Sequence, residues 1–215
     1  SGCRSEKAIT TVNAAPEAAI TSHADGDVVL EGYVLSARGQ VSDSNHAAET
    51  LEAAWYYGEE LACDWEAPDS GGATSCDILT DIEVDNIRLE VRDSDGAASF
   101  DSVTLQVQET GAPLAQILAP TPSDVYYSDQ KVTFEGSVSD EEDDAEQLMV
   151  TWSSDIDGEL DVANQPSGSG EIDGAIYLTE GEHYIRLEVE DLTGKTDSDN
   201  ITITVGPPNS APLCE

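Results

Sequence analysis

Hydrophobic and polar residues alternate along much of the chain. The segments 185–190 (IRLEVE) and 201–205 (ITITV) place an apolar side chain at every second position, and 132–138 (VTFEGSV) continues the pattern. A period of two is typical of strands that have one face buried and the other face in water. We therefore expect a sheet protein in which most strands lie against a core on one side only.

The pattern occurs twice, in two copies of a unit of about 97 residues, and Pro16 and Pro113 mark equivalent positions. The matching segments are NAAPEAAI (13–20) and TGAPLAQI (110–117), GQVSD (39–43) and GSVSD (136–140), LEAAW (51–55) and LMVTW (148–152), and IRLEVRDSDG (87–96) and IRLEVEDLTG (185–194). Residues 47–57 show a helical stripe, but their alignment with the strand-like LMVTW favours a strand. NSAPLCE at 209–215 repeats the opening signature, so the chain is expected to continue into a third unit.

Each unit has room for six to eight short strands, with turn signals every 8 to 12 residues. This spacing is typical of a β-sandwich. We predict an all-β protein made of two tandem immunoglobulin-like sandwiches. The predicted boundaries are listed as follows: 1–12, an N-terminal segment; 13–108, the first sandwich; 109–207, the second sandwich; 208–215, the start of a third repeat.

These segments resemble the polycystic-kidney-disease-type (PKD) repeats and the related cadherin-like modules of bacterial and archaeal surface proteins. The resemblance rests on the opening P-x-A-x-I, the G-x-V-S-D strand end, the tryptophan of the third strand and the GEHYIRLEVEDLTG block (181–194). It implies an extracellular, non-enzymatic spacer or adhesion stalk whose partner is a cell-surface protein or a polysaccharide. The alternative that it implies is a carbohydrate-binding or spacer appendage of a secreted hydrolase.

The composition is strongly acidic, with 45 Asp and Glu against 8 Lys and Arg and a formal net charge of -37. A nucleic-acid partner is excluded, because phosphate recognition needs clustered cations. Adhesion to anionic lipid head groups is disfavoured for the same reason. The sequence has no run near the ~18 apolar residues of a membrane span. With 39% hydrophobic residues the chain is too apolar for a disordered acidic tail.

No residue pattern points to catalysis. His23, His46 and His183 stand at unrelated places in the repeat, and no nucleophile or zinc-protease motif accompanies them. For His183, which begins a strand, we expect a packing role. Carboxylates are too abundant to nominate a glycosidase pair. We expect no enzymatic activity.

Aromatic residues offer two interpretations. Tyr56, Tyr57, Tyr126, Tyr127 and Trp65 could form a platform for sugar stacking, but neighbours in a strand point to opposite faces, so packing roles are favoured. The equivalent tryptophans at 55 and 152 are expected to anchor the cores.

The acidic loops suggest Ca²⁺, which prefers flexible oxygen ligands. SDEEDDAEQ (139–147) holds six carboxylates, and we place Asp191, Asp197 and Asp199 in the turn between the last two strands. The residues expected to converge on calcium, beside the first domain, and so to stiffen the junction between the domains, are Asp140, Asp143, Asp144, Asp191 and Glu109. The first unit's loop, 42–50, has only Asp43 and Glu49 as acids and is expected to bind more weakly. The competing interpretation is a solvated acidic coat.

The cysteines indicate the compartment. Cys63 and Cys76 bracket a Pro- and Gly-containing loop, and a disulfide between them would place the protein in an oxidising, extracytoplasmic environment; the alternative is two free thiols. Ser1-Gly2-Cys3 resembles a lipoprotein cleavage box, which predicts lipidation of Cys3, a surface location and contact with the membrane through that lipid alone. The rival interpretation is that Gly2 closes a preceding domain. Cys214 would belong to the third unit, with its partner downstream, or be a free thiol.

Overall fold

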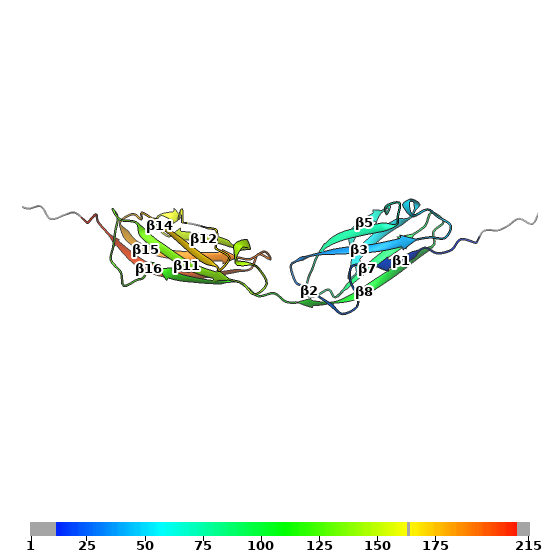
Figure 1. Ribbon diagram of the computed structural model, residues 1–215, viewed down its shortest axis with the longest axis horizontal. Coiled ribbons are helices and arrows are strands. Elements are labelled where there is room, and N and C mark those ends of the chain that lie inside the picture. Colours follow the sequence, from blue (N-terminus) through cyan, green and yellow to red (C-terminus); the bar gives the residue numbers. More distant parts are fainter. Residues whose placement is uncertain (1–11, 163, 210–215) are drawn as a thin grey trace, which may run out of the picture. The chain divides into compact units, whose positions relative to one another are not determined.

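The computed structural model describes residues 12–162 and 164–209. The chain divides into two compact units, residues 1–109 and 110–215, here called the first and second unit. In each unit a three-stranded sheet lies against a five-stranded sheet, as an immunoglobulin-like sandwich requires (Figure 1). The predicted all-β fold is confirmed. The predicted segments 1–12 and 208–215 fall almost entirely outside the described residues.

The first unit has eight strands and one short 3₁₀ helix. In chain order they are β1 (Glu17–Ile20), β2 (Asp27–Leu30), β3 (Val34–Ser42), η1 (Ala48–Thr50), β4 (Glu52–Tyr57), β5 (Glu60–Glu66), β6 (Ala73–Leu79), β7 (Asn86–Arg92) and β8 (Ala98–Gln108). The sheets have the orders β1-β3-β6 and β2-β8-β7-β4-β5. The segment with a helical stripe, 47–57, contains β4, so the strand expected from its repeat partner is confirmed.

The second unit repeats this arrangement strand for strand. Its elements are β9 (Leu114–Ala119), β10 (Tyr126–Tyr127), β11 (Val132–Ser139), η2 (Ala145–Gln147), β12 (Met149–Ser154), β13 (Gly158–Glu159), β14 (Glu171–Ile176), β15 (Gly181–Glu190) and β16 (Thr196–Gly206). The sheets are β14-β11-β9 and β10-β16-β15-β12-β13. The register matches as well, because Val29 lies opposite Val107 in the parallel pair β2 and β8, and the equivalent residues Tyr126 and Val205 lie opposite each other in the parallel pair β10 and β16.

The side chains that alternate between apolar and polar along the sequence also alternate between buried and exposed in the structure. Along β3 every second side chain is buried, and β15 shows the same pattern around Ile185, Leu187 and Val189. Each core contains one fully buried tryptophan, Trp55 in the first unit and Trp152 in the second. The predicted role of both tryptophans as core anchors is confirmed.

A glycine opposite each tryptophan explains the G-x-V-S-D motif. A Cβ atom on Gly39 would collide with Leu89 Cδ2 and lie 3.1 Å from Trp55 Cζ2. A Cβ on Gly136 would lie 3.0 Å from Leu187 Cδ2 and 3.1 Å from Trp152 Cζ2. Both glycines sit on buried positions of the central strand of the smaller sheet. The motif therefore serves packing, because only a residue without a side chain leaves room for the indole ring.

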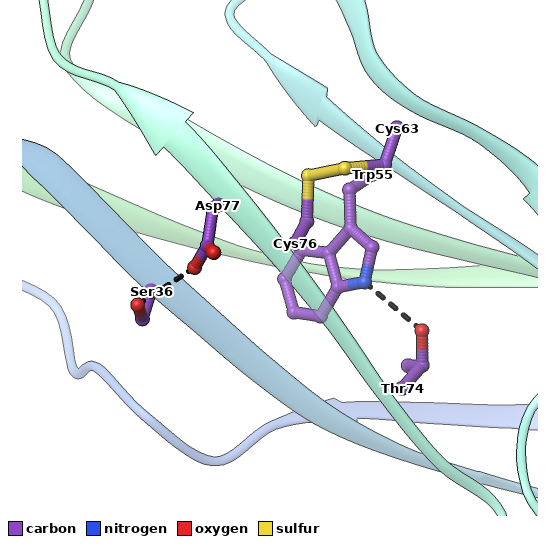
Figure 2. The surroundings of a disulfide bond; sticks show 6 residues. All are labelled: Ser36, Trp55, Cys63, Thr74, Cys76 and Asp77. Atoms are coloured by element: carbon purple, nitrogen blue, oxygen red, sulfur yellow. Dashed lines mark hydrogen bonds between the residues drawn. A yellow bond between two sulfur atoms is a disulfide. The ribbon is translucent and has the colours of Figure 1, made fainter.

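The first unit closes its core with a disulfide between Cys63 on β5 and Cys76 on β6 (Figure 2). The predicted bridge is confirmed, and it links the larger sheet to the smaller one. The sulfur atoms lie beside Trp55, whose Nε1 donates a hydrogen bond of 3.1 Å to Thr74 Oγ1 (Figure 2). Ala37 lies opposite Cys76 in the pairing of β3 with β6. The small alanine leaves volume that the bridge occupies.

The second unit fills the equivalent volume with a ring. Phe134 replaces Ala37 and lies opposite Gly174, which stands where the first unit has Cys76. The Phe134 ring meets Trp152 edge to face, with 5.2 Å between centroids and 79° between planes. Leu160 is buried in the same core. Phenylalanine and leucine thus take the place of the disulfide.

Acids on the last strand hold the first strand of the other sheet. Asp101 Oδ2 accepts the N–H of Ile20 at 2.8 Å, and Asp199 Oδ2 accepts the N–H of Ile117 at the same distance. Asp197 Oδ2 accepts the N–H of Ala115 at 2.9 Å. The expectation that Asp197 and Asp199 lie in the turn was wrong, because β16 begins at Thr196. The strand extends that far because its acidic side chains bond the backbone of an edge strand.

Candidate metal centre

Two hydrogen-bonded turns form one end of the first unit. After β3, Asp43 Oδ1 accepts the backbone N–H groups of Asn45 at 2.6 Å and His46 at 2.9 Å. After β7, Asp93 Oδ1 accepts the N–H groups of Asp95 and of the residue two positions later, each at 2.9 Å. An aspartate that bonds backbone groups just ahead of it is a local turn former, so the short motifs S-D-x-x-H and D-S-D-G fold in this way on their own.

The sandwich brings these two turns together and creates a cluster of three side chains. One donor atom each from Asp43, His46 and Asp93 lies within 4.8 Å of the others. His46 Nδ1 is 3.4 Å from Asp43 Oδ1 and 3.9 Å from Asp93 Oδ2, and His46 Nε2 is 3.5 Å from Asp95 Oδ2. In the part of the chain that the structure describes, no other group of three acidic, histidine or cysteine side chains meets this distance.

The two carboxylates of the cluster are buried and ionised. Neither side chain is exposed to solvent, whereas His46 keeps 15% of its side-chain surface exposed. The N–H of Asn45 has the largest influence on the pKa of Asp43 and lowers it, although burial of the carboxylate opposes this. Burial raises the pKa of Asp93, but the Asn13 amide and backbone N–H groups outweigh it, so the pKa is lowered overall. Two negative charges therefore lie side by side next to one imidazole.

One oxygen of this cluster has no partner. Asp43 Oδ2 is buried and makes no hydrogen bond within the described residues. Asp93 Oδ2, by contrast, accepts a hydrogen bond of 2.7 Å from Asn13 Nδ2. A buried carboxylate oxygen without a donor is costly in an apolar environment, which makes this atom a natural ligand for a cation.

The acidic residues predicted as calcium ligands in the second unit do come together in part. Asp140 Oδ1 accepts the N–H of Asp143 at 2.9 Å, and Asp143 Oδ2 accepts the N–H of Leu192, the residue after Asp191, at 3.0 Å. All three aspartates therefore lie at one end of the unit, and Asp140 Oδ2 is buried without a hydrogen bond. Whether they hold calcium stays a prediction.

The other two predicted ligands behave differently. Asp144 is exposed and precedes η2 without a side-chain hydrogen bond to it. Glu109 is the last residue of the first unit. The second unit also supplies a cation of its own, because Lys195 Nζ donates hydrogen bonds of 2.7 Å to both O and Oγ1 of Thr110. In the first unit the position of Lys195 is occupied by Ala97.

Sequence reasoning missed the cluster of the first unit because it counted acids and left out the imidazole. The usable signal was the repeat alignment, which pairs Asp43 with Asp140 and Asp93 with Asp191. The same alignment puts His46 where the second unit has Asp143. A histidine between two buried turn aspartates has ligand chemistry that a count of carboxylates does not capture.

The expected packing role of His183 is confirmed. The ring is fully buried, its Nε2 donates to Thr179 O at 2.8 Å, and its Nδ1 lies 2.8 Å from Ser154 Oγ. The carbonyl can only accept, so Nε2 carries a hydrogen and donates it to Thr179 O. Both ring nitrogens are thus used within the core.

Three of the aromatic side chains considered for sugar stacking are engaged within the first unit. The guanidinium carbon of Arg88 lies 4.5 Å from the ring centroid of Tyr56, and that of Arg92 lies 4.1 Å from the centroid of Trp65. The hydroxyl of Tyr57 donates to backbone carbonyl oxygens at 2.9 Å. A stacked guanidinium covers a ring face that a sugar would need, so the interpretation as packing residues is favoured.

Cys3 and Cys214 lie outside the described residues. None of the helices in the described part of the chain has the length and apolar character needed to cross a membrane.

Comparison with known proteins supports the fold. No protein-family model matches the chain, and no curated protein matches it. Among solved structures, a Ca²⁺-stabilised adhesin with which an Antarctic bacterium binds ice is 16% identical with a TM-score of 0.51, and the match covers 91% of this chain and 50% of that one. The fibronectin(III)-like modules of Clostridium thermocellum CbhA are 16% identical with a TM-score of 0.44, covering 93% and 99%. An I-band fragment of titin is 12% identical with a TM-score of 0.42, covering 90% and 67%. The chain is therefore similar in fold to the adhesin, and it spans half the length of the adhesin chain that it matches.

Proposed function

We propose that this chain is a non-enzymatic spacer or adhesion segment of an extracellular surface protein, built from PKD-type immunoglobulin-like repeats and anchored by a lipid on Cys3. The observation that carries the proposal is the repetition of one complete domain, with the same strand order in both copies. Repeating a folded module adds length to a protein without adding a reactive site. The disulfide of the first unit supports an oxidising compartment outside the cytoplasm.

The chemistry of the described residues supports a role without catalysis. His183 is used in the core, and the turn aspartates Asp43 and Asp93 each use one carboxylate oxygen to bond backbone N–H groups. The partner that we propose is a cell-surface protein or a polysaccharide. With a net charge of -37, the chain would favour a neutral or cationic surface on that partner.

The strand topology supports a load-bearing role. In the first unit β2 is parallel to β8 over four residue pairs, and in the second β10 is parallel to β16 over two. Each pair joins a strand near the start of its unit to the last strand. Tension on the two ends of a unit pulls these parallel strands past each other, so their hydrogen bonds must break together. The longer pair, β2 with β8, should therefore withstand a higher pulling force.

Pulling single molecules of the full chain tests the spacer function. We expect two discrete unfolding events per molecule, with the first unit unfolding at the higher force because its parallel pair is longer. The disulfide joins two residues that are 13 positions apart in the chain and whose Cα atoms are 6.0 Å apart. Reduction frees this loop to extend, so unfolding of the first unit alone should release about 40 Å more length. Smooth extension without discrete events would contradict the proposal.

We further propose that calcium held by Asp140, Asp143 and Asp191 stiffens the second unit. The buried, unpartnered Asp140 Oδ2 supports this, since oxygen-rich loops suit calcium. Lys195, whose ammonium already lies at Thr110, is the competing cation.

Hydrogen exchange of the full chain, with calcium and with chelator at matched ionic strength, measures the effect. Calcium should slow exchange in residues 140–147, because a bound ion ties the loop to the turn after β15. Asp140→Asn should abolish the effect while keeping the Oδ1 hydrogen bonds, and Asp173→Asn, at an exposed position of β14, should not. If exchange is the same in calcium and in chelator, the loop is only a solvated coat.

A further inference from the structure

We infer that Asp43, His46 and Asp93 of the first unit form a binding site for a divalent transition-metal ion of the Zn²⁺ type. This site is separate from the calcium loop proposed for the second unit, and it differs in ligand chemistry. Its residues come from two turns that are 50 positions apart in the chain and that the sandwich places side by side.

The spacing of the donor atoms suits such an ion. Nitrogen and oxygen ligands at the usual ~2.0–2.2 Å on the corners of a tetrahedron around Zn²⁺ are about 3.3–3.6 Å apart. His46 Nδ1 lies 3.4 Å from Asp43 Oδ1 and 3.9 Å from Asp93 Oδ2, which is close to this spacing. Asn45 Nδ2, 3.2 Å from His46 Nδ1, must turn away when the ion binds. The second oxygen of Asp43, Oδ2, is buried and accepts no hydrogen bond from the described residues, so a ligand atom is available.

The surrounding groups hold these ligands as metal sites usually require. His46 Nε2 lies 3.5 Å from Asp95 Oδ2, which places a carboxylate behind the imidazole while Nδ1 faces the cluster. An outer carboxylate of this kind fixes the orientation of a metal-binding histidine and makes it a stronger ligand. Asn13 orients Asp93 by its 2.7 Å hydrogen bond to Oδ2. The turn amides that bond Asp43 Oδ1 orient the other carboxylate.

The charge of the site also favours a bound cation. The side chains of Asp43 and Asp93 are not exposed to solvent, and no lysine or arginine side chain forms an ion pair with either among residues 12–162 and 164–209. The equivalent end of the second unit carries the ammonium of Lys195, whereas the first unit has Ala97 at that position. The first unit therefore lacks a built-in cation where the second has one, and an exogenous cation can supply the missing positive charge.

The imidazole decides which cation fits. Calcium and magnesium take oxygen ligands, whereas nitrogen from histidine suits zinc and its neighbours among the transition metals. One nitrogen and two carboxylate oxygens complete three positions, and water can take a fourth. The site therefore favours Zn²⁺ over Ca²⁺, in contrast to the all-oxygen loop of the second unit.

Titration of the full chain with Zn²⁺ tests the inference. Free thiols are alkylated beforehand, with the disulfide intact, so that Cys3 and Cys214 cannot bind the metal, and excess Mg²⁺ suppresses loose binding to the acidic surface. We expect one Zn²⁺ per chain by native mass spectrometry and calorimetry. Co²⁺ at the same site should give the visible absorption of tetrahedral coordination, and hydrogen exchange should slow in both turns of the first unit.

Four variants locate the ion. His46→Ala should weaken Zn²⁺ binding more than about 100-fold, because it removes a direct ligand, and Asp95→Asn should weaken it about 10- to 100-fold, as expected for an outer partner. Ala97→Lys places an ammonium as in the second unit and should weaken binding at least tenfold by competition. His23→Ala, which removes a histidine outside the cluster, should bind like the unchanged protein.

Two outcomes of these measurements would contradict the inference. If His46→Ala and Ala97→Lys both bind Zn²⁺ as tightly as the unchanged protein, the site is not where we place it. If Ca²⁺ displaces Zn²⁺ at equal concentration, the inferred preference is wrong. Ala97→Lys keeps the inference testable if the His46 variant fails to fold, because it leaves all the ligands and both turns in place.

Discussion

Replacement of Phe134 by alanine should lower the free energy of unfolding of the second unit by about 3–5 kcal/mol. The ring is fully buried and packs edge to face on Trp152. Opposite it on β14 stands Gly174, which has no side chain that could move into the space. The cavity would therefore remain, and its full cost would appear as lost stability.

Hydrogen exchange of the full chain can follow this loss, since it reports the opening free energy of each unit separately. Phe100→Ala is the matched control, because Phe100 is the only other phenylalanine of the chain and is 64% exposed. The control should change stability by less than about 0.5 kcal/mol. A loss below about 1 kcal/mol in the Phe134 variant would show that the core of the second unit closes around the cavity.

Removal of the disulfide should destabilise the first unit by about 3 kcal/mol, the loop-closure value for a bridge between residues 13 positions apart. The double variant Cys63→Ser and Cys76→Ser avoids a reducing agent. Loss of packing beside Trp55 adds to this cost, because Ala37 cannot fill the space that the sulfur atoms leave.

The same exchange measurement checks the disulfide variant, with the second unit as an internal control that should not change. Chemical denaturation followed by tryptophan fluorescence gives a second readout. Equal stability of the first unit with and without the bridge would mean that the unfolded chain is already compact around this loop. The entropic argument would then fail for this protein.

Comparison of the two cores shows how one fold is reached by two sets of residues. The first unit combines Ala37 with a disulfide, and the second combines Phe134 with Gly174. The sequence allowed the bridge to be predicted from its loop, and its repeat alignment places the larger ring of Phe134 where the first unit has Ala37. It did not show that Gly174 makes room for that ring, because the two residues are 40 positions apart and meet only through the pairing of β11 with β14.

The amino-acid sequence alone indicates most of the strands and the repeat. An alternating strand must bury one face, and this requirement acts within a few residues, so the pattern can be read locally. The same holds for the turns, in which Asp43 and Asp93 bond backbone groups two to four positions away. These features need no knowledge of the rest of the chain.

The tertiary structure decided which turns meet. His46 belongs to the turn after β3 and Asp93 to the turn after β7, on strands of different sheets. Their ligand atoms come within metal-binding distance only when the two sheets pack face to face. Lys195 likewise reaches Thr110 across 85 positions, so the built-in cation of the second unit is visible only in the folded domain. A local pattern constrains the direction of a side chain, whereas its distant partners depend on how the core packs, and the charge balance of each site follows from that packing.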